Sequence, residues 1–259
     1  MKKYVMDFVV TESQRLSPLY GLITLSPANG EALPEIVPGQ FVQVRVDGSP
    51  STFLRRPISI NFVNYQTRTL SLLVRRAGDG TAKLIEAKAG DIINLLLPLG
   101  NGFSMPADKS ARILLIGGGV GVAPLLYFGH ILKENGYTPE FLLGARSKTD
   151  LLELEQFQQI GTVHVSTEDG SMGEKGLVTV HSRLQRPLDH IYCCGPAPMM
   201  KAVAAVATKM GAECEVSLEN MMACGLGACL CCVEQTVKGN VCVCTEGPVF
   251  NINQLTWQN

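Results

Sequence analysis

Short apolar runs alternate with turn-forming clusters along the first hundred residues. Some runs alternate apolar and polar residues, as in 20–26, and others are continuously apolar, as in 91–100. Glycine, proline, serine and aspartate separate them, as at 47–50. Short strands at this spacing predict an antiparallel barrel that is closed or nearly closed. The predicted strands lie at 4–10, 20–26, 40–46, 56–63, 69–76 and 91–100.

A helical pattern interrupts these strands at residues 81–88. Thr81 is the predicted N-cap, because a threonine hydroxyl can accept a hydrogen bond from the first helical turn. Gly90 is the predicted stop. We therefore expect residues 1–104 to form a β-barrel domain, followed by a linker near 105–110.

Residues 105–217 follow a different pattern, in which apolar strands alternate with helices. Such alternation predicts βα units around a parallel sheet, and thus an α/β domain. The predicted strands lie at 111–119, 141–146, 163–169 and 190–196, and the predicted helices at 123–136, 151–159 and 197–211. The uncharged stretch 113–129 is short and broken by glycine and proline, so we interpret it as a buried strand, turn and helix rather than a membrane span.

Residues 218–259 form a third, small segment that begins with a cysteine-rich loop. The segments 233–239 and 240–246 predict a hairpin that turns across Lys238, Gly239 and Asn240. The fold class that we predict is therefore a β-barrel plus an α/β domain, with a small C-terminal module.

Composition and charge narrow the range of partners. The chain of 259 residues has 22 basic and 23 acidic side chains and no basic stripe, which argues against nucleic acid as a partner. The N-terminus lacks the apolar core of a signal peptide, and nine cysteines, an odd number, argue against structural disulfides. We expect a cytoplasmic protein without a membrane partner. No nucleophile–histidine–acid set is present, so we expect no catalytic side chain of that kind.

Six of the nine cysteines lie between residues 224 and 244. Cys224, Cys229 and Cys232 have the spacing C-x4-C-x2-C, which with a later cysteine is the plant-type [2Fe–2S] pattern. Gly225 and Gly227 allow the loop to curl around a cluster, because glycine reaches backbone angles that other residues avoid. Structural zinc is the main alternative, although it usually takes paired C-x2–4-C knuckles.

The fourth ligand is either Cys242 or Cys244. Both would lie on one face of a strand, because side chains in a strand repeat every two residues, so periodicity does not distinguish them. Cys231 is adjacent to Cys232, and the x2 spacing selects Cys232 of that pair.

Two features of the barrel are suited to phosphate. An arginine followed by proline, as in Arg56-Pro57, presents a fixed guanidinium fork. The segment 75–81 leads through Gly78 and Gly80 into a helix N-terminus, which attracts anions. Together they favour a pyrophosphate and hence a dinucleotide, although an arginine pair in solvent beside a turn is an equal alternative on these residues alone.

Two glycine turns each follow an apolar strand and precede a helix. The first, GGGVGVAP at 117–124, differs from G-x-G-x-x-G because Ala123-Pro124 stand where the last glycine would be. The second is CCGPAPMM at 193–200. Turns of this kind at the carboxyl ends of parallel strands place a crevice between them, and ordinary tight turns are the alternative.

The combination of RPIS, GGGxGxAP and CGP resembles the ferredoxin-NADP reductase superfamily, with a flavin-binding barrel before a nicotinamide-binding α/β domain. The added segments MMACGLGACLCC and VCTEGPVF resemble the electron-transfer subunits of class B dihydroorotate dehydrogenases. This resemblance covers essentially the whole chain. It implies an FAD-binding barrel at 1–104, an NAD-binding domain at 105–217 and a [2Fe–2S] module at 218–259.

The resemblance also implies site residues. For FAD these are Arg56, Pro57, Ile58, Ser59, Leu73, Val74, Arg75, Gly80 and Thr81; for the nicotinamide cofactor, Gly117, Gly118, Gly119, Gly121, Cys194, Gly195 and Pro196; and for the cluster, Cys224, Cys229, Cys232 and Cys244. Cys244 is preferred over Cys242 because it stands in the family's C-[TD]-[DE]-G-P-V-F context. The interval between Cys232 and Cys244 is short for the family, and Cys231 is an additional cysteine.

The resemblance implies a partner and an activity. A catalytic subunit would oxidise dihydroorotate on its FMN, and electrons would pass through the cluster and FAD to NAD+, for pyrimidine (UMP) biosynthesis in a heterotetramer of two catalytic and two electron-transfer subunits. We prefer NAD to NADP because no basic cluster calls for a 2′-phosphate.

Two alternatives stay open. One is the flavin subunit of a sulfhydrogenase or of an NADH-dependent ferredoxin:NADP reductase, which commonly reads CGxGKCGHC where this chain reads CGLGACLCC. The other is a zinc-stabilised binding module without a redox role, which predicts a colourless protein that contains zinc and no flavin.

Overall fold

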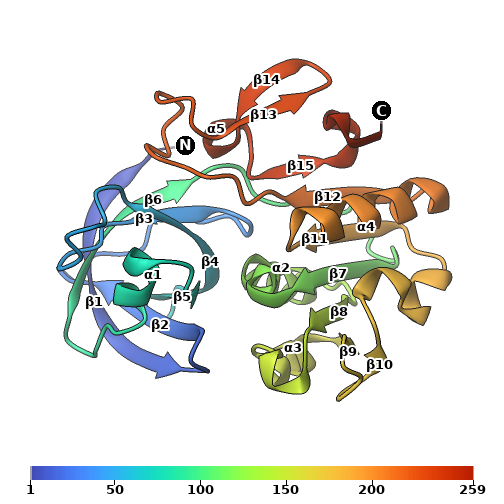
Figure 1. Cartoon of the computed structure of the whole chain (residues 1–259), viewed down its shortest axis with the longest axis horizontal. Helices are drawn as coiled ribbons and strands as arrows, with labels where there is room; N and C mark the ends of the chain where they lie inside the picture. Colours follow the sequence, from blue (N-terminus) through green and yellow to red (C-terminus); the bar gives the residue numbers. More distant parts are fainter. Residues whose placement is uncertain (1, 259) are drawn as a thin grey trace.

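The computed structural model describes residues 2–258 and has three parts (Figure 1). A barrel lies beside a sheet that is covered by helices, and a small cysteine-rich part lies across one end of both (Figure 1). No helix among residues 2–258 is long and apolar enough to cross a membrane.

The first part is an antiparallel barrel that closes on itself, in the strand order β1-β2-β5-β4-β3-β6. The strands are β1 Tyr4–Arg15, β2 Tyr20–Pro27, β3 Phe41–Val44, β4 Arg56–Asn64, β5 Thr69–Arg75 and β6 Ile92–Leu99. Every predicted strand of this part is present, and the closed form of the predicted barrel is confirmed. Inward-facing aliphatic side chains such as Val42, Val44 and Leu72 fill the interior.

The helix of the barrel begins earlier than the sequence predicted. It is α1, Asp79–Leu84, and its N-cap is Gly78. The prediction of Thr81 as N-cap was therefore wrong, and so was the extension to residue 88. Thr81 is the third helical residue, and its hydroxyl oxygen accepts hydrogen bonds from the backbone N–H groups of Ala77 and Gly78. The hydroxyl thus reaches back from inside the first turn, which permits a glycine at the cap.

The second part is a sheet in the order β10-β9-β8-β7-β11-β12-β15 over the described residues. The strands are β7 Ile113–Gly118, β8 Glu140–Ala145, β9 Thr162–Thr167, β10 Glu174–Lys175, β11 His190–Cys194, β12 Glu213–Ser217 and β15 Val249–Asn251. The helices are α2 Ala123–Glu134, α3 Leu154–Ile160 and α4 Ala197–Met210. Short 3-10 turns are η1 Gly119–Val122, η2 Lys148–Asp150, η3 Val178–Val180, η4 Ser182–Gln185, η5 Ile252–Gln254 and η6 Thr256–Gln258.

This sheet confirms the predicted α/β pattern and adds three strands, β12 and β15 at one edge and the short β10 at the other. β12 continues the parallel order beside β11, and β15 pairs antiparallel with β12. β15 comes from the last part of the chain, so that part is joined to the sheet by backbone hydrogen bonds. The two glycine turns follow β7 and β11, which are neighbouring parallel strands.

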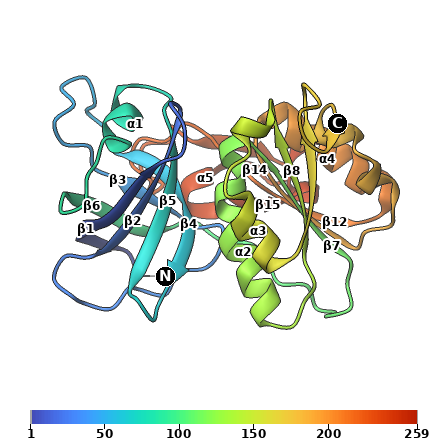
Figure 2. The same cartoon turned by 90° about the horizontal axis from the view of Figure 1, so that it is seen from below.

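The helices lie in two layers around the sheet. α2 and α3 lie on the face toward the barrel, and α4 lies on the opposite face (Figure 2). α2 packs directly against β4 of the barrel. The barrel and the sheet therefore meet along α2. This contact holds the glycine turns of the sheet beside β4, the barrel strand that carries the RPIS motif.

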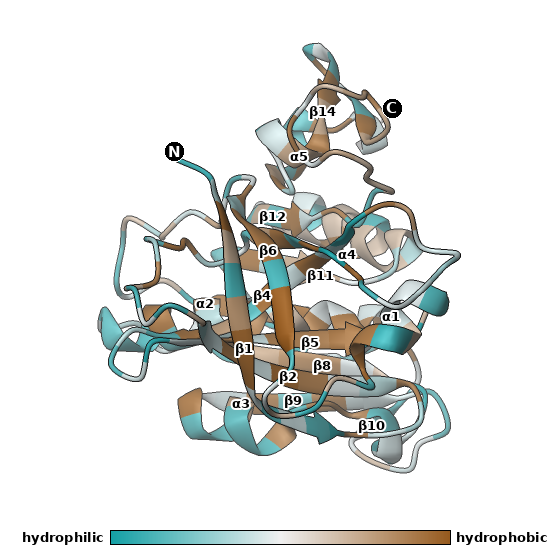
Figure 3. Cartoon of the chain, turned by 90° about the vertical axis from the view of Figure 1, so that its left-hand side faces the viewer, coloured by the Kyte–Doolittle hydropathy of each residue, from teal (hydrophilic) through white to brown (hydrophobic). Residues whose placement is uncertain are grey.

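The third part holds the hairpin of β13 Val233–Thr236 and β14 Gly239–Cys242, followed by the short helix α5 Val243–Glu246. It stands at one end of the molecule (Figure 3). The predicted second strand ends at Cys242, so the prediction that Cys242 and Cys244 share one face of a strand was wrong. Cys244 lies in α5, because the chain turns into a helix directly after β14.

Candidate functional site

A cavity of about 260 Å³ lies where the three parts of the chain meet. Six of the residues that resemble flavin ligands line it: Pro57, Ile58, Ser59, Leu73, Arg75 and Thr81. Val120 and Ala123 contribute from the second part. Leu218, Glu219, Asn220, Met222 and Pro248 contribute from the third. The structure therefore brings the barrel motif, the first glycine turn and the edge of the cysteine-rich part to one space.

Strand pairing brings the barrel residues to this cavity. β3 and β4 are antiparallel, and Phe41 faces Ser59 across them, so both side chains reach the same opening. Arg75 ends β5 and Thr81 lies in the first turn of α1. Val74 is different, because its side chain is fully buried in the barrel core, so only its backbone can face a cofactor.

Arg56 lies against the start of α1. A Cβ placed on Gly80 would be 2.9 Å from Arg56 Nε and 3.0 Å from Thr52 Cγ2. A side chain at position 80 would meet Arg56 and Thr52, so glycine allows Arg56 Nε to lie close to the first turn of α1, where the helix N–H groups have no partner within the helix. That combination suits a phosphate group.

The two glycine turns touch each other at the carboxyl ends of β7 and β11. A Cβ placed on Gly121 would lie 2.5 Å from the carbonyl oxygen of Cys194 and 2.7 Å from Gly195 Cα. A Cβ on Gly118 would lie 2.6 Å from Met199 Sδ. The sheet order changes direction at this point, since β8 lies on one side of β7 and β11 on the other. Such a switch point is where open α/β sheets bind their ligands.

The cysteine loop is curled, and its N–H groups point at sulfur. Backbone N–H groups donate from Leu226 to Cys224 Sγ at 3.3 Å, and from Gly227 to Cys244 Sγ at 3.2 Å. The N–H of Cys244 donates to Cys232 Sγ at 3.4 Å. Gly225 and Gly227 have φ of +71° and +79°, values that glycine adopts without strain.

These contacts separate Cys244 from Cys242. Cys244 is buried, receives an N–H bond from the loop and gives one to Cys232, so it faces the inside of the loop. Cys242 is half-buried; its sulfur bonds toward the carbonyl oxygen of Gly227 at 3.9 Å and also contacts Cys232, but it receives no backbone N–H bond from the loop among the described residues. The arrangement favours Cys244 as the fourth ligand.

The environment of the loop lowers one thiol pKa and raises two, since burial raises the pKa of Cys242 as well as that of Cys244. The N–H bond from Leu226 is the largest cause that lowers the pKa of Cys224, to about 6. Burial raises the pKa of Cys244 to about 12. Metal binding replaces the thiol proton, and the same N–H groups that face these sulfurs are suited to stabilise thiolates.

The donor set fits an iron–sulfur cluster. Cys224, Cys229 and Cys232 lie on one loop, and Cys244 lies on α5, after the β13–β14 hairpin. N–H groups are directed at the sulfurs of Cys224, Cys232 and Cys244. Among residues 2–258, no three Cys, His, Asp or Glu side chains converge as ligands of a single metal ion. A [2Fe–2S] cluster distributes four thiolates over two irons.

Several cavity residues were not predicted from the sequence. Phe41 and Glu219 are the most informative, since Glu219 carries the carboxyl group of the lining. Burial raises the pKa of Glu219, whereas the charge of Arg75 opposes the shift. The thiol of Cys194, at the second glycine turn, lies 4.0 Å from Glu219 Oε1. No sequence signal marked Glu219, because its position follows from the pairing of β11 with β12.

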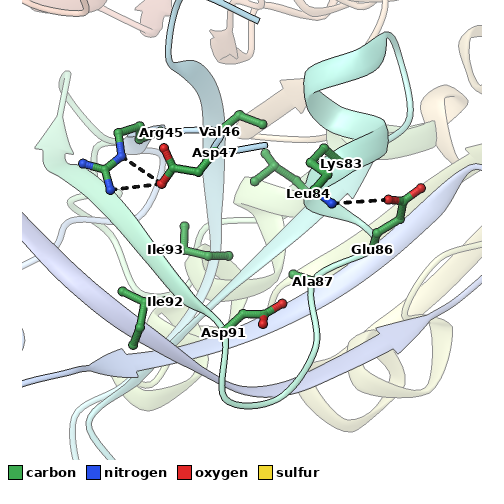
Figure 4. A pocket seen from close by; sticks show the side chains of 10 residues that line it. All are labelled: Arg45, Val46, Asp47, Lys83, Leu84, Glu86, Ala87, Asp91, Ile92 and Ile93. Atoms are coloured by element: carbon green, nitrogen blue, oxygen red, sulfur yellow. Dashed lines mark hydrogen bonds and ion pairs between the residues drawn. The ribbon is translucent and has the colours of Figure 1, made fainter. Parts of the chain in front are cut away.

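A second hollow, of about 290 Å³, lies on the barrel between the end of β3, α1 and the start of β6 (Figure 4). Four of its five charged side chains pair with each other, Arg45 with Asp47 at 3.0 Å and Lys83 with Glu86 at 3.9 Å, and the fifth, Asp91, accepts a hydrogen bond from the N–H of Lys88. Its lining contains none of the residues predicted to bind a cofactor. We therefore assign no cofactor to it.

The barrel, the nucleotide-type crevice and the cysteine loop together define a modular oxidoreductase with an iron–sulfur domain. A family model for the iron–sulfur cluster binding domain of dihydroorotate dehydrogenase B matches residues 219–256, and one for the oxidoreductase NAD-binding domain matches residues 115–205. The chain belongs to the family of electron transfer subunits of NAD+-dependent dihydroorotate dehydrogenase B.

Its relatives match over most of their length. The electron transfer subunit of dihydroorotate dehydrogenase B from Shouchella clausii is 41% identical, with 84% of this chain and 86% of that protein covered. The one from Listeria innocua is 37% identical, with 96% and 97% covered. A solved structure of an NADH-dependent reduced ferredoxin-NADP oxidoreductase is 28% identical, with a TM-score of 0.86 over 97% of this chain and 90% of that one.

Proposed function

We propose that the chain carries electrons from the FMN of a partner dihydroorotate dehydrogenase subunit to NAD+, by way of a [2Fe–2S] cluster and FAD. The reaction serves pyrimidine (UMP) biosynthesis. The observation that carries the proposal is the single cavity shared by the flavin-type motif, the first glycine turn and the edge of the cysteine-rich part. A flavin bound there would contact residues of the first glycine turn on one side and residues just before the cysteine loop on the other.

The three parts divide the work. Residues 1–104 bind FAD, residues 105–217 bind NAD(H), and residues 218–259 bind the cluster. A bound flavin supplies the exchange between single electrons and an electron pair, since an iron–sulfur cluster handles one electron at a time. The protein's own contribution is to bind, orient and shield these groups.

The flavin residues have separate roles. Arg56, Gly80 and the first turn of α1 hold the pyrophosphate, because they combine a guanidinium with free N–H groups. Ser59 on β4 and Arg75 on the neighbouring β5 line the cavity and would contact the flavin. Ile58 and Leu73 supply its apolar sides, and Val74 contributes only backbone.

The nicotinamide is held by the two touching turns. The two turns pack against each other through glycine. Their backbone at the carboxyl ends of β7 and β11 would hold the cofactor, through Gly117, Gly118, Gly119 and Gly121 on one side and Cys194, Gly195 and Pro196 on the other. Val120 and Ala123, which belong to the first turn and to the helix after it, also line the flavin cavity, so a nicotinamide held at the turns would lie beside a flavin in that cavity. NAD is the cofactor in the names of the relatives, and the absence of a basic cluster in the sequence supports NAD over NADP.

The partner binds at the third part of the chain. Around the cysteine loop, Met221 is 83% exposed, Leu230 65% and Leu226 46%, an apolar surface suited to a protein partner. Cys229, a proposed ligand, is itself exposed there. The partner is the FMN-containing catalytic subunit, in an assembly of two plus two subunits.

The test is reconstitution with that catalytic subunit. The mixture should reduce NAD+ when dihydroorotate is added, and neither protein alone should do so. An absence of coupled activity from two fully loaded subunits would contradict the proposal. The NADH-dependent ferredoxin:NADP reductase alternative predicts instead that reduced ferredoxin and NADP+ are the productive pair.

A further inference from the structure

Gln43 is a fully buried glutamine whose amide has no partner in the protein. Its exposure is 0%, and neither Nε2 nor Oε1 has a hydrogen-bond partner among residues 2–258. Buried polar groups in native proteins are nearly always hydrogen-bonded, so an unpaired amide calls for an explanation.

A neighbouring glutamine shows that this barrel can satisfy a buried amide. Gln40 is 1% exposed. Its Oε1 accepts a hydrogen bond of 2.8 Å from the N–H of Val37, and its Nε2 donates one of 2.7 Å to the carbonyl oxygen of Gly100. Gln40 is paired and Gln43 is not because the two side chains face different surroundings.

Gln43 faces the cysteine loop. β3 alternates, so Val42 and Val44 point into the barrel core while Phe41 and Gln43 point to its outer face. Phe41 lines the proposed flavin cavity. A Cβ placed on Gly225 would lie 2.8 Å from Gln43 Cγ and 3.1 Å from Gln43 Nε2.

The glycine in the loop keeps this approach open. Gly225 follows the proposed ligand Cys224, has φ of +71° and has no side chain to stand between the amide and the loop. The backbone of Gln43 is also fixed, because it pairs with β4 at Pro57 and its carbonyl oxygen accepts a hydrogen bond from Arg55 Nη1 at 3.1 Å. The unpaired amide is thus held against the loop from the barrel side.

We propose that Gln43 is a positioning residue that donates a hydrogen bond from its amide N–H to a sulfur of the cluster in this loop, and thereby raises the cluster's reduction potential. The inference rests on the proposed cluster. A reduced cluster carries one more negative charge than an oxidised one, so an N–H donor stabilises the reduced form more. Hydrogen bonds to the sulfurs are one of the factors that set cluster potentials.

The test compares three variants with the full-length wild-type protein. Gln43→Met removes the donor and keeps an apolar side chain of similar length, and Gln43→His keeps an N–H donor. Gln235→Met makes the same change at an exposed site on β13, in the part of the chain that holds the cysteine loop. Each protein is assayed for iron, for the midpoint potential by EPR-monitored titration, and for exchangeable protons coupled to the cluster by ENDOR in H2O and D2O.

We expect Gln43→Met to keep its iron and to have a lower potential. A tenfold shift of the one-electron equilibrium corresponds to about 59 mV. It should also lose one exchangeable proton coupling, whereas Gln43→His and Gln235→Met stay near the wild type. If a buried water is the partner of the amide instead, Gln43→Met leaves the potential and the proton coupling unchanged. That result would overturn the inference.

Two further outcomes are distinguishable. If Gln43→Met assembles no cluster, the same measurements are made on Gln43→Asn, whose amide is one methylene shorter and so lies farther from the loop. An unchanged potential and proton coupling in Gln43→Asn would also overturn the inference. If the wild-type protein itself binds no iron, the proposed function fails and not only the role of Gln43.

Discussion

Asn61 on β4 donates a hydrogen bond of 2.8 Å to Glu153 at the start of α3, and this bond joins the barrel to the sheet. Both side chains are buried. The remaining oxygens, Asn61 Oδ1 and Glu153 Oε2, have no partner among residues 2–258. A proton on Glu153 Oε2 would provide the donor that Asn61 Oδ1 lacks. Burial accordingly raises the pKa of Glu153 to about 7.

We expect Glu153→Gln to stabilise the protein above neutral pH. The folded state holds the Glu153 proton more tightly than the unfolded chain. The resulting stability is fully present below about pH 4.5 and is lost as the pH rises to about 7. A shift of this size corresponds to about 3 kcal/mol at 1.36 kcal/mol per pKa unit. Glutamine needs no proton and can donate to Asn61 Oδ1.

Urea unfolding at pH 5 and pH 8 tests this prediction. The stability difference between Glu153→Gln and the wild type should favour the variant more at pH 8 than at pH 5. Glu168→Gln, at an exposed position, is the matched control and should show no such change. A variant that is equally destabilised at both pH values would refute the role of the proton.

The contacts of Cys244 and Cys242 predict different results for their serine variants. Cys244→Ser should lose the cluster, with iron falling from about two per chain to near zero, because Cys244 faces the inside of the loop. Cys242→Ser should keep its iron, since its sulfur bonds toward a carbonyl oxygen. Iron and sulfide assays of anaerobic protein measure this; the reverse pattern would assign the ligand to Cys242.

A second serine pair tests the electron route. Cys229→Ser should remove the cluster and the coupling of the partner to NAD, but FAD and NADH-dependent dye reduction should remain, because the flavin cavity has no lining from Cys229. The exposed Cys231 is the control, and Cys231→Ser should keep the cluster. Normal coupled turnover in a cluster-free Cys229→Ser protein would show that electrons take another path.

The contact between the glycine turns predicts a nucleotide-binding defect. A methyl group at Gly121 would meet the carbonyl oxygen of Cys194 at 2.5 Å, so Gly121→Ala must move the turns apart. Small displacements of a reacting centre can cost up to about 100-fold in rate. We expect at least a tenfold loss in kcat/KM for NADH with ferricyanide as acceptor, at unchanged flavin content. An unaltered kcat/KM would place the nicotinamide elsewhere.

Local patterns in the sequence predicted much of the fold. Strand alternation in the barrel, the βα units and the cysteine spacing each depend on neighbouring residues, so they were visible in the sequence. The error at Thr81 was also local: the threonine reaches back from the third helical position, a capping geometry that residue type alone does not distinguish from an N-cap.

Long-range pairing was not predictable in the same way. β15 returns from the third part to pair with β12, which brings Pro248 to the flavin cavity. Glu219 reaches the same cavity only because β12 pairs with β11. Gln43 reads as an ordinary polar residue of a strand until the cysteine loop covers it. Such positions depend on contacts between distant segments, which the hydrophobic periodicity of a short stretch of sequence does not predict.

Cofactor content is the most direct test of the central claim. The protein is purified anaerobically, its absorption spectrum is recorded, and flavin, iron, sulfide and zinc are assayed on the same sample. The account predicts one FAD with about two irons and two sulfides per chain. Zinc without flavin would contradict it and would favour a zinc-stabilised binding module.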